Sequence, residues 1–107
     1  MLKLSRAPKD SLLTWARSML EIKRTSTFKK DTKKIKDGKI FILLADVLEC
    51  LISSKKLDEK YRDHALAGEY SGYRECHLRP DVLFIYKVEA GALYTYRIGS
   101  HSELFKK

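Results

Sequence analysis

The sequence contains few of the residues that mark whole classes of protein. It has two cysteines, two prolines and five glycines among 107 residues, which excludes collagen-like, proline-rich and disulfide-rich architectures. Cys50 and Cys76 lack the spacing of a CxxC or zinc pair, so we expect two free, buried thiols in a reducing compartment. The longest apolar run, residues 40–45, is far shorter than the roughly 18 to 20 residues that span a bilayer. The N-terminus also lacks the apolar stretch of a signal peptide, and we therefore expect a cytoplasmic protein.

Common catalytic motifs and acidic residues are scarce as well. There is no P-loop, no GxGxxG, HExxH or GxSxG motif and no EF-hand loop, so nucleotide hydrolysis and metalloprotease chemistry lose support. The chain has 22 Lys and Arg against 14 Asp and Glu, a formal charge of +8. The whole excess lies in residues 1–39, because residues 40–107 carry ten bases and ten acids. This segregation favours an anionic partner, either nucleic acid or a membrane surface, over a merely solvated helix face.

The hydrophobic pattern predicts one α+β domain. Alternation over residues 20–24 predicts a short half-buried strand, and the spacing of apolar residues over 39–54 predicts an amphipathic core helix. Between them, residues 27–36 form a basic helix that Asp37-Gly38 ends, and the two helices make an antiparallel hairpin. Residues 55–71 read as a loop with a short helical turn near 60–64. Three strands then follow as an antiparallel meander over 73–78, 82–88 and 93–98, with the apolar middle strand at its centre and a short tail after residue 99.

Residues 1–18 do not fit this pattern. They carry a short amphipathic stretch, yet strand-like alternation resumes directly after Met19. We expect them to be an N-terminal extension, either loosely docked or lying upstream of a true start at Met19. An intact mass of the native protein that begins at Met1 would exclude the second alternative.

The three histidines are the clearest chemical signal. In an antiparallel meander, His77, Asp81 and His101 come to the same edge of the sheet, and pairing of Val88 with Ala92 leaves His101 about 7 Å beyond Asp81. Imidazoles beside a basic surface suit metal-free RNA cleavage, because one can accept a proton and another donate it near neutral pH. A zinc site from the same residues remains an alternative, although no pair has zinc-like spacing. Cys76 and His77 lie on opposite strand faces and cannot act as a thiol–imidazole pair.

The aromatic residues allow two interpretations. Five of them fall in the predicted meander and either stack on bases or fill the core: Tyr73, Phe84, Tyr86, Tyr94 and Tyr96. Phe105 stands on the polar tail, where burial is less necessary, and is free to stack on a base.

Three motifs together resemble one known family. They are Asp63-His64-Ala65-Leu66 with Gly68, then Gly72-Tyr73-Arg74 with His77 and Pro80-Asp81, and finally Gly99-Ser100-His101 with Leu104-Phe105. In this order and at these separations they resemble the YafQ-type toxins of the RelE/ParE superfamily, over residues 19–107. The resemblance implies a RelE-like α+β fold in which a helical hairpin packs on a four-stranded antiparallel sheet that includes the N-terminal strand. It also implies the toxin of a bacterial type II toxin–antitoxin pair, an endoribonuclease whose relatives often cut mRNA on the ribosome.

The same resemblance assigns roles to individual residues. It places His64, His77, Asp81 and His101 in the active site, with His64 as base and His101 as acid or the reverse. His77 and Asp81 would position and stabilise the phosphorane, and Phe105 would stack on a nucleotide. We expect no metal or cofactor. Val82 departs from relatives that carry an aromatic residue there, which puts base stacking at that position in doubt.

Basic side chains and a protein partner complete the expectation. Arg74 and Arg97 either contact the substrate phosphate or are strand-edge charges, and the basic helix with Lys29, Lys30 and Lys33 suits ribosomal RNA. The expected protein partner is an acidic, partly disordered antitoxin. The alternative function is a non-catalytic toxin of the same fold, either a ParE-like gyrase inhibitor or an inactivated relative. A peptide acting at the membrane surface is disfavoured by the strong predicted core.

Overall fold

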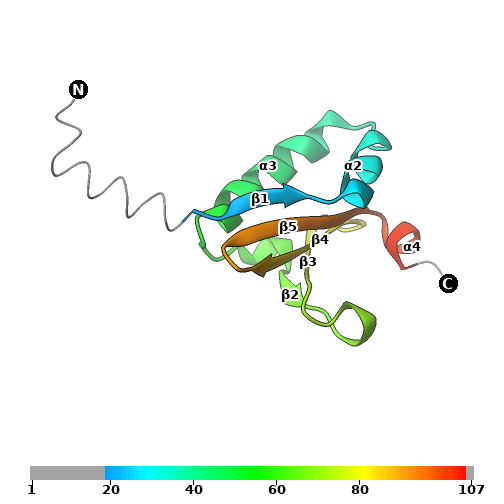
Figure 1. The fold of residues 1–107 in the computed structure, drawn as a ribbon. Helices are drawn as coiled ribbons and strands as arrows, with labels where there is room; N and C mark the ends of the chain where they lie inside the picture. The colour runs from blue at the N-terminus through cyan, green and yellow to red at the C-terminus, as the bar shows by residue number, and fades with distance from the viewer. Residues whose placement is uncertain (1–18, 106–107) are drawn as a thin grey trace, which may run out of the picture.

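The computed structural model describes residues 19–105, so the predicted extension 1–18 lies outside the described residues. These residues form one five-stranded sheet with helices on one of its faces and at one end (Figure 1). The elements in chain order are β1 (Glu21–Arg24), α2 (Ser26–Lys33), α3 (Gly38–Ile52), a 3₁₀ turn (Glu59–Tyr61), β2 (His64–Ala65), a second 3₁₀ turn (Gly68–Tyr70), β3 (Arg74–Arg79), β4 (Val82–Glu89), β5 (Ala92–Gly99) and α4 (His101–Leu104). The predicted α+β class is confirmed. No helix in residues 19–105 is long and apolar enough to cross a membrane.

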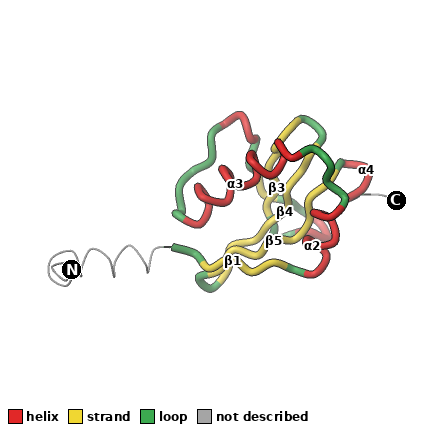
Figure 2. The backbone as a smooth tube through the Cα atoms, turned by 90° about the horizontal axis from the view of Figure 1, so that it is seen from above, coloured by secondary structure: helices red, strands yellow, loops and turns green. Residues whose placement is uncertain are grey.

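The sheet has the strand order β1-β5-β4-β3-β2, and Figure 2 shows β1, β5, β4 and β3 following one another in this order. The predicted antiparallel meander of β3, β4 and β5 is confirmed. The central strand β4 is buried on both faces. Phe84 and Tyr86 pack with the core residues of α2 and α3, whereas Leu83 and Ile85 pack with Leu104 on the opposite face. We call this second face, which α2 and α3 do not cover, the open face.

The prediction of four antiparallel strands is wrong in two respects. Strand β1 runs parallel to β5, with Glu21 opposite Ala92, and the short strand β2 adds a fifth member antiparallel to β3. Hydrophobic alternation marks a strand but does not encode the direction of its neighbour, which depends on how the strand is packed and connected. All four residues of β1 are exposed, including Ile22 at 41%, so the predicted half-buried strand is instead an edge strand.

The boundary between the two helices also differs from the prediction. Thr25 caps α2, which ends at Lys33. Asp37 begins α3 rather than ending α2, because its carboxylate accepts a hydrogen bond from the Lys39 backbone N–H at 2.9 Å. This bond, assisted by Arg79, lowers the pKa of Asp37. Aspartate is a favoured N-cap residue, so the signal was present in the sequence but was assigned to the wrong helix.

The register of β4 and β5 shifts the site residues. Glu89, not Val88, lies opposite Ala92, because Ala90 and Gly91 form a two-residue turn in which both have positive φ. An irregularity between Ile85 and Tyr86 shifts the register once more, so that Leu83 lies opposite Gly99. The two shifts bring Asp81 next to His101 instead of opposite Gly99. Such a bulge cannot be read from alternation alone.

Candidate active site

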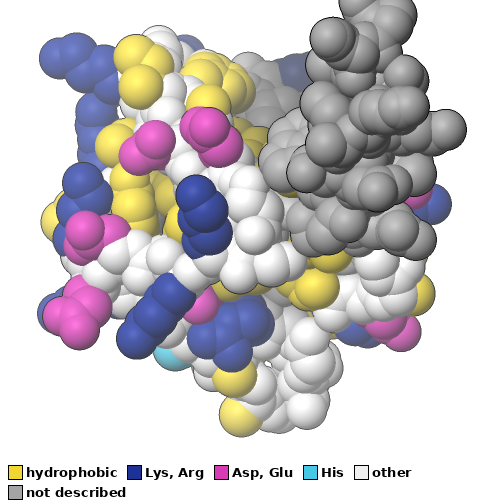
Figure 3. All heavy atoms as spheres, turned by 90° about the vertical axis from the view of Figure 1, so that its left-hand side faces the viewer, with side chains coloured by type: hydrophobic (Ala, Val, Ile, Leu, Met, Phe, Trp, Pro, Cys, Tyr) yellow, Lys and Arg dark blue, Asp and Glu magenta, His cyan; other side chains and the backbone are white. Residues whose placement is uncertain are grey.

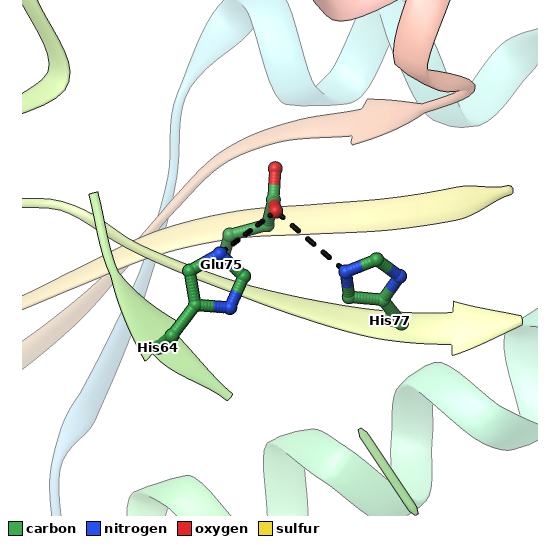
Figure 4. Close-up of side chains that lie close together, drawn as sticks. All are labelled: His64, Glu75 and His77. Atoms are coloured by element: carbon green, nitrogen blue, oxygen red, sulfur yellow. Dashed lines mark ion pairs between the residues drawn. The ribbon is translucent and has the colours of Figure 1, made fainter. Parts of the chain in front are cut away.

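Two histidines and a buried glutamate form a cluster on the open face. Cys76 is buried in the core beneath α3, so its neighbours Glu75 and His77 point to the opposite side of the strand. His64 lies across from Glu75 in the β2–β3 pairing. The Nε2 atoms of His64 and His77 lie 3.2 and 3.7 Å from Glu75 Oε1, and Figure 4 shows both rings directed at this carboxylate. We call these three residues the histidine–glutamate triad.

Glu75 was not predicted, although its i, i+2 spacing from His77 on a strand indicates a shared face. The residue is only 5% exposed, and its Oε2 atom is buried without a hydrogen-bond partner in the described part of the chain. A buried carboxylate is unfavourable unless positive charge or hydrogen-bond donors compensate it. The triad therefore attracts a positively charged group, either a protonated imidazole or a cation.

Two oxygen neighbours fix the orientation of the His64 ring. Its Nδ1 lies 2.7 Å from the Arg62 carbonyl oxygen, while its Nε2 lies 3.2 Å from Glu75 Oε1. Each ring nitrogen can donate a hydrogen bond when it carries a proton. The ring is therefore held between the loop backbone and the buried carboxylate.

The triad also has the composition of a metal site. One donor atom from each residue lies within 4.8 Å of the others, and two imidazoles with one carboxylate are ligands that transition metals accept. The three residues could therefore hold a metal ion, although their sequence spacing did not suggest it. The β2–β3 pairing brings His64 to the other two.

Asp63 anchors the segment that carries His64. Its carboxylate accepts hydrogen bonds from the Tyr86 hydroxyl and from Nε and Nη2 of Arg74, the latter at 3.0 Å. Burial and the bond to Asp63 raise the pKa of Tyr86, and the same carboxylate raises the pKa of Arg74. Arg74, predicted either to contact the substrate phosphate or to be a strand-edge charge, is paired with Asp63 and keeps 43% of its side chain exposed, so its contact with substrate stays a prediction.

Asp81, His101 and Phe105 form a second cluster where β5 ends. Asp81 Oδ1 accepts a hydrogen bond from the His101 backbone N–H at 3.0 Å, so the predicted gap of about 7 Å is closed by the register shifts. The ring of Phe105 lies 5.0 Å from that of His101. Among the described residues, no hydrogen bond, ion pair or aromatic contact joins this cluster to the triad. The predicted four catalytic residues thus form two groups, His64 with His77 and Asp81 with His101.

The predicted short tail is in fact a helix, α4, and its cap orients His101. Ser100 Oγ accepts from the Glu103 N–H at 3.2 Å, and Glu103 Oε1 accepts from the Ser100 N–H at 2.8 Å. This Ser-x-x-Glu capping box is visible in the sequence, and it was the missed signal. Gly99 precedes it because a Cβ there would lie 2.8 Å from Glu103 Oε1.

The Arg97 side chain is held by Asp31 of α2. Its Nε donates to Asp31 Oδ2 at 2.7 Å and its Nη2 to Oδ1 at 3.2 Å, which raises the pKa of Arg97. Asp31 also accepts from the Ile98 backbone N–H at 3.1 Å. Arg97 lines a cavity of about 900 Å³ together with Arg79, Asp81 and Phe105. The cavity is lined by basic and acidic side chains in equal number, and two of its arginines, Arg79 and Arg97, are paired with Asp37 and Asp31.

The predicted RNA-binding lysines Lys29, Lys30 and Lys33 are exposed on α2, while Lys34 and Lys36 line the cavity beside Arg97. On the face drawn in Figure 3, by contrast, basic and acidic side chains are interspersed. Both cysteines are free, and burial raises the pKa of Cys76 to about 12, which excludes a thiolate nucleophile there.

Comparison with solved structures defines the class of protein. The chain superimposes on a copper-bound L66S mutant toxin from Helicobacter pylori with a TM-score of 0.74 and 38% identity, covering 81% of this chain and 100% of the other. It also superimposes on the toxin of the DinJ–YafQ toxin–antitoxin complex of Escherichia coli with a TM-score of 0.69 and 33% identity, covering 81% and 98%. The fold is that of bacterial toxins of type II toxin–antitoxin systems.

Sequence comparison identifies the family. The family described as bacterial toxin of type II toxin–antitoxin system, YafQ, matches residues 20–106, and the chain belongs to it. The mRNA interferase toxin YafQ of Escherichia coli is 34% identical over 87 residues, covering 79% of this chain and 95% of that protein. A putative toxin YafQ of Haemophilus influenzae is 40% identical over 60 residues, covering 52% of this chain and 59% of that protein. The predicted RelE-like fold and toxin family are confirmed.

Proposed function

We propose that the chain is an endoribonuclease toxin that cleaves mRNA, without a required metal, by attack of a ribose 2′-OH on the adjacent phosphate. The observation that carries this proposal is the buried Glu75 carboxylate shared by two imidazoles on the open face. Such an arrangement holds histidines in place for proton transfer and compensates their positive charge. The name of the Escherichia coli relative, mRNA interferase, supports the same activity.

In this mechanism His64 takes the proton of the 2′-OH and His101 gives a proton to the leaving 5′-oxygen. The new O–P bond forms as the P–O5′ bond breaks, leaving a cyclic phosphate and a free 5′-hydroxyl. His77 and Arg97 stabilise the charge on the phosphorane oxygens. Asp81, through its bond to the His101 backbone, positions α4. The reverse assignment, with His101 as base and His64 as acid, is the competing form of the mechanism.

The partners follow from charge and from the relatives. An acidic, partly disordered antitoxin is the expected protein partner, and the DinJ–YafQ complex supports it. The exposed side chains of Lys29, Lys30 and Lys33 on α2 would contact phosphates of ribosomal RNA. Binding of the ribosome there would bring the mRNA close to the cavity that Arg97 lines. The site of action would be the cytoplasm, where translated mRNA lies.

The pH dependence of single variants tests the mechanism. His64→Ala and His101→Ala should each retain the fold and each lose a different limb of the pH–rate profile. Identical profiles would refute the division of roles. In cells, induction of the wild type should yield cleaved mRNA by primer extension and His101→Ala should not. Growth arrest without cleavage would instead favour a non-catalytic toxin.

A further inference from the structure

Aromatic rings on the open face form a continuous series that begins at the second cluster. Phe105 contacts His101, and Tyr70 lies 5.4 Å from Phe105 between ring centroids. Tyr70 in turn lies 6.2 Å from Tyr96, which lies 4.8 Å from Tyr73. We call Tyr70, Tyr73 and Tyr96 the tyrosine track.

The track differs from the aromatic residues of the core. Phe84 and Tyr86 stack on each other beneath the helices and are almost fully buried, so they are unavailable to a ligand. The three track residues are only partly buried. Of the five aromatic residues predicted to be either a platform or core, Phe84 and Tyr86 are core, whereas Tyr73, Tyr94 and Tyr96 remain partly exposed, so stacking on bases stays a prediction for these three.

Tyr70 gives the best indication that the track is built to bind. It comes from the 3₁₀ turn Gly68–Tyr70 rather than from the sheet, and the flanking Gly68 and Gly72 adopt positive φ to fold the turn back. The turn thereby lays an aromatic ring against Phe105, while leaving that ring partly in solvent. Exposed aromatic rings in a row are the usual means of holding unpaired bases.

The far end of the track carries a small hollow. A cavity of about 190 Å³ is lined by Tyr73, Tyr94, Tyr96, Lys87 and Glu89 among others, and Lys87 Nζ lies 5.2 Å from the centre of the Tyr73 ring. Lys87 Nζ is also paired with Glu89 Oε1 at 3.0 Å, so this end offers tyrosine rings and a space beside them rather than net positive charge. Aromatic rings beside a hollow suit the stacking of a base.

We propose that the tyrosine track binds bases of the single-stranded RNA that flank the scissile phosphate, by stacking that tolerates any sequence. The proposal rests on the proposed function for its ligand and extends it beyond the catalytic residues. RNA is favoured over a protein segment because the track is continuous with the His101–Phe105 contact, which belongs to the proposed active site. Because each stacked base contributes to affinity, loss of one ring should weaken binding by at least about fivefold, and about tenfold is expected.

The experiment measures binding rather than cleavage, so that the two proposals can fail separately. Fluorescence anisotropy is recorded at one fixed salt concentration with an RNA oligonucleotide that carries a 2′-deoxy substitution at the cleaved position. Tyr70→Ala and Tyr70→Leu should each raise Kd about tenfold, while Tyr70→Phe should stay within about twofold of wild type. The matched control is Phe41→Ala, because Phe41 is a 41% exposed ring on α3 and should leave Kd unchanged.

Further readouts separate stacking from a structural effect. The leucine variant keeps an apolar contact with Phe105, so equal thermal midpoints with weaker RNA binding would support stacking. The slope of log Kd against log salt should not change, because no phosphate contact is removed. Wild-type affinity in both Tyr70→Ala and Tyr70→Leu, or loss in Tyr70→Phe equal to that in Tyr70→Ala, would overturn the proposal. Weaker binding of the antitoxin with unchanged RNA binding would also overturn it, by assigning the track to the protein partner.

Discussion

The contact between Asp31 and Arg97 makes a quantitative prediction about stability. Asp31 is 6% exposed and accepts three hydrogen bonds, two from the Arg97 guanidinium and one from the Ile98 backbone. It therefore attaches α2 to the end of β5, next to the second cluster. The perturbation is Asp31→Ala, which removes all three acceptor contacts at once.

The magnitude follows from what each donor loses. The Ile98 N–H lies in the core and would remain unsatisfied, which costs about 1–3 kcal/mol. Breaking a fully buried ion pair costs about 3–5 kcal/mol, but the Arg97 side chain is 22% exposed and can recover part of its hydration. We expect a total loss of about 3 kcal/mol in the free energy of unfolding. For a domain of this size, each 1 kcal/mol lowers Tm by about 4–8 °C.

Urea unfolding of wild type, Asp31→Ala, Asp31→Asn and Arg97→Ala measures the effect. Asp31→Asn should lose about half as much as Asp31→Ala, because its amide oxygen can still accept from the Ile98 N–H. In a double-mutant cycle, Asp31 and Arg97 should couple by more than about 1 kcal/mol. A loss below about 1 kcal/mol in Asp31→Ala would refute the reasoning, since exposed surface pairs contribute about 0–1 kcal/mol.

Three further predictions concern the thiols, the cap and the triad. In the native protein Cys50 should react with a thiol reagent at pH 8 and the buried Cys76 should not. Because the pKa of Cys76 is raised to about 12 in the folded state, the unfolded state loses this proton first, and the free energy of unfolding should fall as pH rises above about 9. Cys76→Ala should reduce that slope, and an unchanged slope would contradict the assignment. Gly99→Ala should displace the Glu103 side chain from the capping box, and we expect it to lower the rate of cleavage and to lower Tm by a few degrees. Wild-type values of both the rate and Tm would show that the approach of Glu103 Oε1 to residue 99 is unimportant. Zinc or copper ions should inhibit cleavage reversibly by occupying the histidine–glutamate triad, because a metal-bound imidazole nitrogen cannot accept a proton. Activation by these ions, together with loss of activity in EDTA, would contradict the metal-independent mechanism.

The elements that the sequence predicted well are those set by local periodicity. The apolar run of β4 marked the central strand, and the i, i+3, i+4 spacing in α3 marked the core helix, because both patterns record which side of an element faces the interior. A capping box is also a local sequence pattern, so Ser100 and Glu103 could have predicted the helix α4 that starts at His101. Family motifs marked the three histidines without any knowledge of their distances.

The contacts that give the site its chemistry depend on pairs far apart in the chain. Glu75 belongs to the triad only because β2 pairs with β3 and brings His64 beside it. Arg97 is held by a residue 66 positions earlier, and Asp81 meets His101 only after the register of two strands has shifted. Side-chain periodicity determines burial, which the sequence shows by itself. Strand direction, register and the partners of buried charges are determined by packing between distant segments, and for this protein only the tertiary structure supplied them.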